Sequence, residues 1–177
     1  ILQGLLKSTL VLTMAIVGLG YFVTGGLGLN AAGGPFANRA AIRHLSTLAA
    51  GLLAVLAFGA YLAIPATLTE ASGIVHGASN ADVEARLPAL RLLMMAALAG
   101  GLLALYQTAC RRLWPIAAAV GLYAAVSLGG TAYAALVQRF IVAPNEQVKE
   151  TPFILHNIEA TRAAFALGAV EERQLPG

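Results

Sequence analysis

The sequence predicts an all-α polytopic membrane protein with four transmembrane helices and a short amphipathic helix in its C-terminal tail. The first observation is composition, because 59% of the 177 residues are hydrophobic and only 11% are charged, whereas soluble domains carry about 25% charged residues. The second is a set of long uncharged intervals, each able to hold the roughly 20 apolar residues that cross a bilayer. The third is that these intervals do not alternate apolar and polar residues, as β-barrel strands do. Because lipid cannot satisfy backbone amides, each interval should be an α-helix.

The uncharged intervals divide the chain into a transmembrane region, residues 1–139, and a more polar tail, residues 140–177. The first apolar run is broken by GGLGLNAAGGPFAN, where glycine and proline predict a loop. The spans are expected near residues 5–25, 44–66, 88–109 and 113–137.

A helix start precedes the third span. In SNADVEARLPALR, Ser79 and Asp82 have the spacing of a capping box, in which each side chain satisfies a free backbone amide of the new helix. This helix should begin before the membrane and continue into the third span through Pro88. The missing amide of that proline predicts a kink.

The tail should contain one further helix. Thr151 suits the N-cap, Pro152 suits the first helical position, and Gly168 can end the helix. One face carries Ile154, Ile158, Thr161 and Phe165. This helix can lie on a membrane surface, or it can be the first helix of a soluble domain. The second interpretation is favoured, because the polar face is not rich in lysine.

Small residues spaced four apart predict where helices pack in lipid, since they let backbones approach closely. Such spacing also arises by chance in a sequence rich in alanine and glycine. The fourth span has a stripe of three small residues and the third span has a pair, respectively Gly121, Ala125 and Gly129, and Ala97 and Gly101.

The sequence contains no recognisable reaction centre. The histidines, His44, His76 and His156, lie in three separate segments, and neither HExxH nor CxxC occurs, so no metal site is predicted. No cofactor is predicted either. His44, near the start of the second span, is a candidate axial ligand for a haem or chlorophyll-type metal. The alternative, a polar residue anchoring a helix end at the interface, is favoured.

Transport and hydrolysis also lack a clear signature. Ion pathways usually place charges inside spans, and here no charge lies at the centre of a span. Gln107, Ser127 and Thr131 are weak polar marks, which helix-to-helix hydrogen bonds explain equally well. No GxSxG or GxxxxGK motif occurs. The basic residues form no stripe suited to nucleic acid, and no soluble small-molecule substrate can be identified.

Two separated motifs resemble a known family. GASNADVEARLPAL and ALVQRFIVAPNEQVKETPFILHNIEATRAAFAL are together similar to segments of an uncharacterised bacterial family of large multi-pass membrane proteins. Phe153 and Ala166 depart from that pattern, which has tyrosine and glycine there. The residues that match it are Asp82, Arg86, Pro88, Pro144, Asn145, Glu146, Asn157, Thr161 and Arg162.

The resemblance implies about seven spans followed by a large extracytoplasmic domain. This chain would then hold the later spans and the start of that domain, and the native polypeptide would continue beyond Gly177. The resemblance implies no catalytic residue, because the family has no assigned reaction. It also implies a bacterial inner membrane location with the tail outside the cytoplasm, which puts the loop containing Arg111 and Arg112 in the cytoplasm.

The leading functional hypothesis is a non-catalytic scaffold or accessory subunit of a larger membrane assembly, with the lipid bilayer and other membrane subunits as partners. The alternative is a component of a transporter or channel, since broken, glycine-rich segments line many transport sites. An enzyme is the third possibility, and its chemistry would have to come from outside this chain.

Overall fold

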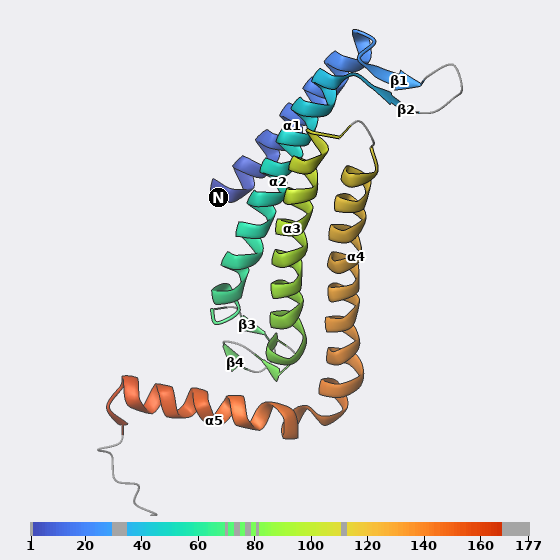
Figure 1. The fold of residues 1–177 in the computed structure, drawn as a ribbon. Coiled ribbons are helices and arrows are strands. Elements are labelled where there is room, and N and C mark those ends of the chain that lie inside the picture. The colour runs from blue at the N-terminus through green and yellow to red at the C-terminus, as the bar shows by residue number, and fades with distance from the viewer. Residues whose placement is uncertain are drawn as a thin grey trace, which may run out of the picture.

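The computed structural model describes residues 2–29, 35–69, 71–72, 75–76, 79–80, 82–110 and 113–167. The fold is all-α, as the sequence predicts, and it also contains two very short antiparallel hairpins (Figure 1). The helices are α1 (Leu2–Val23), α2 (Arg39–Ala66), α3 (Leu87–Gln107), α4 (Trp114–Val137) and α5 (Glu146–Ala164), and the strands are β1 (Leu27–Leu29), β2 (Pro35–Ala37), β3 (Ala71–Ser72) and β4 (Val75–His76).

Four of the helices, α1 to α4, are long and apolar enough to cross a membrane. They stand side by side, and α5 runs across one end of them, steeply inclined to their axes (Figure 1). The helix α2 begins at Arg39, earlier than the expected span. The prediction used the uncharged interval alone, whereas a helix can continue past a span while its arginines reach towards water.

The connection from α1 to α2 is a hairpin rather than the simple loop that was predicted. Gly25 ends α1 with a φ of 72°, and the amides of Gly25 and Gly26 donate to the carbonyls of Phe22 and Tyr21 at 3.2 and 2.7 Å. This is the Schellman pattern, which requires a left-handed residue. The strands β1 and β2 then pair, because the backbone amides and carbonyls of residues outside the helix still need hydrogen-bond partners.

The core is a seam of small residues between α2, α3 and α4. Its buried cluster combines one leucine with alanines from all three helices, namely Ala49, Ala50, Leu53, Ala104 and Ala119. At Gly100 an added Cβ would lie 3.4 Å from Leu53 Cδ1 and 3.5 Å from the Ala119 carbonyl oxygen. Small side chains therefore let the three helices approach closely, as expected for helices in lipid.

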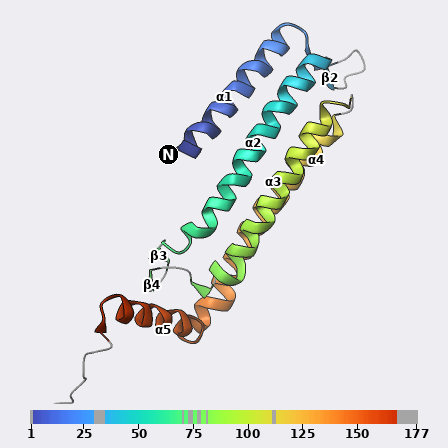
Figure 2. The same cartoon turned by 60° about the vertical axis from the view of Figure 1, so that its left-hand side comes forward.

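The first helix is attached more loosely. Among the described helices, α1 packs mainly along α2 (Figures 1 and 2), and none of its residues is buried. Near its end the Tyr21 hydroxyl and His44 Nδ1 form a hydrogen bond of 2.6 Å. That contact links α1 to α2, while both interpretations of His44, an anchor of the helix end at the interface and an axial ligand, stay predictions.

The tail helix begins earlier than predicted. Thr151 is not its N-cap, because α5 starts at Glu146 and Pro152 lies inside it. The prediction assumed that proline must stand in the first turn. On an exposed helix, however, water can bond the carbonyl that the proline leaves without an amide partner. The helix ends at Ala164, and the predicted end, Gly168, lies outside the described residues.

Candidate functional site

Two π-helical turns meet at the end of the bundle that faces α5. One turn, Asp82–Arg86, leads into α3, and the other, Gln138–Val142, follows α4. Ala85 of the first turn is fully buried and forms one cluster with Val137 and Val142. Each family motif therefore contributes one π-helical turn to the same contact. Such turns are rare and often mark functional sites, so this junction of the two motifs is the candidate site.

The first motif is held by the predicted capping box. The Ser79 amide donates to Asp82 Oδ2 at 3.1 Å, and the Asp82 amide donates to Ser79 Oγ at 3.3 Å. The Ser79 hydroxyl also donates to Asp82 Oδ2, at 2.9 Å. The reciprocal arrangement satisfies two amides of the new helix. The predicted helix start is therefore confirmed.

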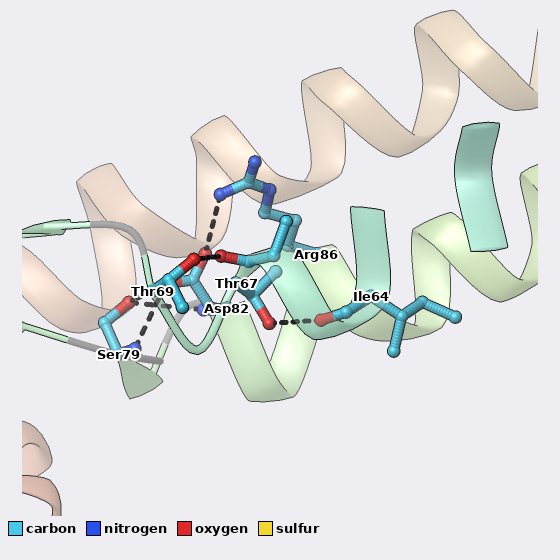
Figure 3. Close-up of polar contacts among 7 residues, drawn as sticks. Ile64, Thr67, Thr69, Ser79, Asp82 and Arg86 are labelled. Atoms are coloured by element: carbon cyan, nitrogen blue, oxygen red, sulfur yellow. Dashed lines mark hydrogen bonds and ion pairs between the residues drawn. The ribbon is translucent and has the colours of Figure 1, made fainter. Parts of the chain in front are cut away.

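Asp82 is the centre of this polar group. Its other oxygen, Oδ1, accepts from an Arg86 guanidinium nitrogen at 3.4 Å, so the carboxylate lies between Ser79 and Arg86 (Figure 3). Its exposed fraction is only 7%, and a buried carboxylate is costly unless it is paired and hydrogen-bonded. With both oxygens engaged, Asp82 is suited to fixing the backbone of the turn.

The tail is tied to this turn by residues that the sequence analysis did not single out. Lys149 of α5 lies 3.8 Å from Glu84 Oε1, and the Asn80 side-chain amide donates to the same oxygen at 3.4 Å. An exposed ion pair contributes at most about 1 kcal/mol. The contact therefore helps orient α5 more than it stabilises the fold. The spacing between Glu84 and Lys149 in the sequence carried no signal for it.

The other motif residues lie in α3, in the turn before α5 and along α5. Pro88 stands in the first turn of α3, so the irregularity expected there takes the form of the π-helical turn just before it. Pro144 and Asn145 form a 3-10 turn, Ala143–Asn145, and Glu146 begins α5. On α5, Asn157 is half-buried, whereas Thr161 and Arg162 are exposed.

Two of the predicted packing residues lie inside the bundle. Ala97 is fully buried. A Cβ added at Gly101 would lie 3.8 Å from the Ala50 carbonyl oxygen, so this glycine faces α2. The α3 pair therefore lies where α3 meets other helices of the bundle.

The stripe on α4 is not packed against any other described part of the chain. A Cβ added at Gly121 or at Gly129 would find no atom within 4 Å among the described residues, and Ala125 is exposed. The face of α4 that packs on α3 instead includes Ala119 and Gly130, and a Cβ added at Gly130 would lie 3.0 Å from Ala89 Cβ.

An apolar groove begins beside the stripe. It has a volume of about 290 Å³ and lies between the first turns of α3 and the second half of α4. Pro88 and Leu92 form one wall, and Val126, Gly129 and Tyr133 form the other. Gly129 therefore belongs to the stripe and to the groove at once.

The remaining polar candidates serve helix contacts. The buried Gln107 accepts a hydrogen bond from the Ile116 amide at 3.3 Å. This bond satisfies an amide in the first turn of α4, because the N-cap residue Leu113 has no side-chain hydrogen bond to offer. Thr131 donates to the Ser127 carbonyl within α4. His156 is exposed on α5, and the His76 side chain lies outside the described part of the chain. Among the described residues no three His, Cys, Asp or Glu side chains gather in a way that could hold a metal ion.

Fold and site together define a helical, multi-pass membrane protein whose two long motifs meet at one end of the bundle. The chain belongs to the Uncharacterised protein family (UPF0182), whose sequence profile matches residues 1–177. It is 36% identical over 174 residues to a UPF0182 protein of Frankia casuarinae, covering 96% of this chain and 17% of that relative.

Other relatives give the same result. A UPF0182 protein of Desulforamulus reducens is 33% identical over 181 residues, covering 99% of this chain and 19% of the relative. One of Geobacter sulfurreducens is 36% identical over 173 residues, covering 96% and 19%. The chain thus spans less than a fifth of the length of these curated relatives. No solved structure matches it.

Proposed function

We propose that this chain is a non-catalytic scaffold within a larger bacterial inner-membrane protein or assembly. The observation that carries the proposal is the apolar groove between α3 and α4, which continues into the uncovered stripe of small residues on α4. Scaffold spans must offer surfaces to other helices. This surface has the composition that helix association in lipid requires.

The expected occupant of the groove is another transmembrane helix of the longer protein. The relatives are more than five times as long as the matched segment, since it covers 17 to 19% of their length. Between apolar helices in lipid, association depends on close packing. Glycine at positions 121 and 129 leaves room for a neighbouring backbone, and the walls of the groove can receive its side chains.

The basic residues alone do not choose an orientation in the membrane. Arg39 and Cys110 line the same cavity, so the α1–α2 and α3–α4 connections lie at one end of the bundle. The sequence adds Arg43, Arg111 and Arg112 to these segments, but it also has Lys7, Arg86, Arg91 and Arg139 near the other ends of the spans. Neither side therefore has the clear excess of bases that marks the cytoplasmic side. An extracytoplasmic tail is supported by the family resemblance instead.

Labelling of Cys110, the only thiol of the chain, tests this orientation. A membrane-impermeant maleimide applied to intact cells should label Cys110 only after the membrane is opened. Cys110 is half-buried, so a membrane-permeant maleimide provides the control for its reactivity. Prompt labelling from outside would show that the protein has the opposite orientation, with its tail in the cytoplasm.

Co-purification tests the scaffold role. Gly129→Leu should lower the yield of stoichiometric membrane partners or of the closed full-length fold, because it fills the groove. Ala124→Leu places the same leucine side chain at another exposed position of α4 and should leave that yield unchanged. The alternative, a transporter or channel component, predicts solute flux into liposomes above that of empty liposomes. Such flux, abolished by a substitution in the groove, would replace the scaffold proposal.

A further inference from the structure

A second cavity lies at the end of the bundle away from α5. It has a volume of about 380 Å³ and is bounded by strand β2, the first turn of α2 and the turn between α3 and α4. Its lining combines a smaller polar part with a larger apolar part. The residues that matter are Phe36, Asn38, Arg39, Ile42, Cys110 and Leu113.

The polar part of this cavity is positively charged. Arg39 is exposed and stands in the first turn of α2, which contains no acidic residue. Arg43 follows one turn later, on the same side of the helix. A cation at a helix N-terminus adds to the positive end of the helix dipole instead of offsetting it. The chain has no carboxylate in residues 1–69 with which to balance this charge. The complementary ligand is therefore an anion.

The apolar part of the cavity indicates what kind of molecule bears the anionic group. Phe36, Ile42 and Leu113 provide an apolar wall beside the guanidinium group, which a freely soluble phosphate could not use. Next to Leu113, the exposed Trp114 begins the α4 span, and tryptophan is enriched at the level of the lipid headgroups. A ligand with a phosphate next to the start of an acyl chain fits both parts of the cavity.

We propose that this cavity binds the headgroup of an anionic phospholipid. Arg39 holds the phosphate, and the glycerol ester region lies against Phe36, Ile42 and Leu113. The site would secure the end of the bundle at which the α1–α2 and α3–α4 connections lie. The inference does not depend on the scaffold role, because it uses a different end of the molecule.

Trp114 is the only tryptophan of the chain and follows Leu113 of the cavity lining, so its fluorescence reports on lipid close to the site. The full chain is placed in phosphatidylcholine nanodiscs that contain a small fraction of brominated lipid, with bromine near the ester end of the acyl chain. Brominated phosphatidylglycerol should quench Trp114 at a concentration about fivefold lower than brominated phosphatidylcholine, the preference expected from one arginine near the surface. Arg39→Gln should abolish that preference.

Three comparisons make the result decisive. Arg91→Gln removes an exposed arginine at the opposite end of α3 and should keep the preference, and Arg39→Lys should keep most of it, since the charge remains. Circular dichroism checks that each variant retains its helices. Equal quenching by the two lipids, or equal losses in Arg39→Gln and Arg91→Gln, would overturn the proposal. Displacement by millimolar inorganic phosphate would identify a soluble-anion site and overturn the lipid assignment.

Discussion

Both faces of α4 carry small residues, but only one of the two faces is packed against α3. On the face towards α3, Ala119 is fully buried and Gly130 comes so close to Ala89 that an added Cβ would lie 3.0 Å from it. On the outer face, Gly121 and Gly129 have open space where a Cβ would stand. Small residues on the first face have been used for packing within this chain. Those on the second are free for packing against something else, which is the basis of the scaffold proposal.

The largest expected effect comes from breaking the packed face. Gly130→Leu forces a side chain into the contact with Ala89, and overpacking of a tight interior costs about 1–3 kcal/mol. We expect thermal unfolding in detergent to shift to clearly lower temperature. Gly129→Leu, one residue along, should leave the chain's own unfolding temperature nearly unchanged. Equal losses in the two variants would remove the distinction between the faces.

The next effect concerns the junction of the two motifs. Asp82→Ala deletes the acceptor of the capping box and the partner of Arg86, and losing such a cap costs about 0.5–2 kcal/mol. The destabilisation should be local, so hydrogen exchange should rise in residues 82–90 before it rises in α2. Glu84→Ala, which removes the ion pair with Lys149 and the hydrogen bond from Asn80 but leaves the capping box in place, is the matched control. Equal hydrogen exchange in the two variants would show that Asp82 does not fix the backbone of this turn.

A smaller effect, of opposite sign, is expected at the end of α5. Ala166 has a φ of 53°, a left-handed conformation that is strained by about 1 kcal/mol for residues with a Cβ. Ala166→Gly should therefore slow hydrogen exchange in the last turn of α5. Ala163→Gly, placed inside the helix, should speed it, because glycine weakens a helix interior. A faster exchange in Ala166→Gly would show that the turn does not persist in solution.

Ala166 also shows how the sequence and the structure complement each other. The family pattern has glycine at this position, and the positive φ now gives the physical reason. The four spans and the capping box could be predicted because hydropathy and cap spacing are local signals. The start of α5 was misplaced because Pro152 is a strong local signal that an exposed helix can override.

The candidate site was only partly accessible from the sequence. Asp82 and Arg86 lie in a recognisable motif, but the contact of Ala85 with Val137 and Val142 joins segments far apart in the chain. The periodicity of apolar residues along a sequence does not predict a contact between segments that are far apart in it. The same limit applies to the stripes of small residues. Spacing alone could not tell that Ala97 lies inside the bundle whereas Gly121 lies outside it.

The most direct test of the central claim is photocrosslinking from the outer face of α4. Benzoylphenylalanine replaces Tyr133, an exposed aromatic residue of the groove wall, and Ala124 as the control, in the native polypeptide in its own membrane. After irradiation, mass spectrometry identifies what each position has captured. The scaffold account predicts that position 133 captures one defined transmembrane segment and that position 124 captures mainly lipid. Capture of lipid alone at position 133 would contradict it.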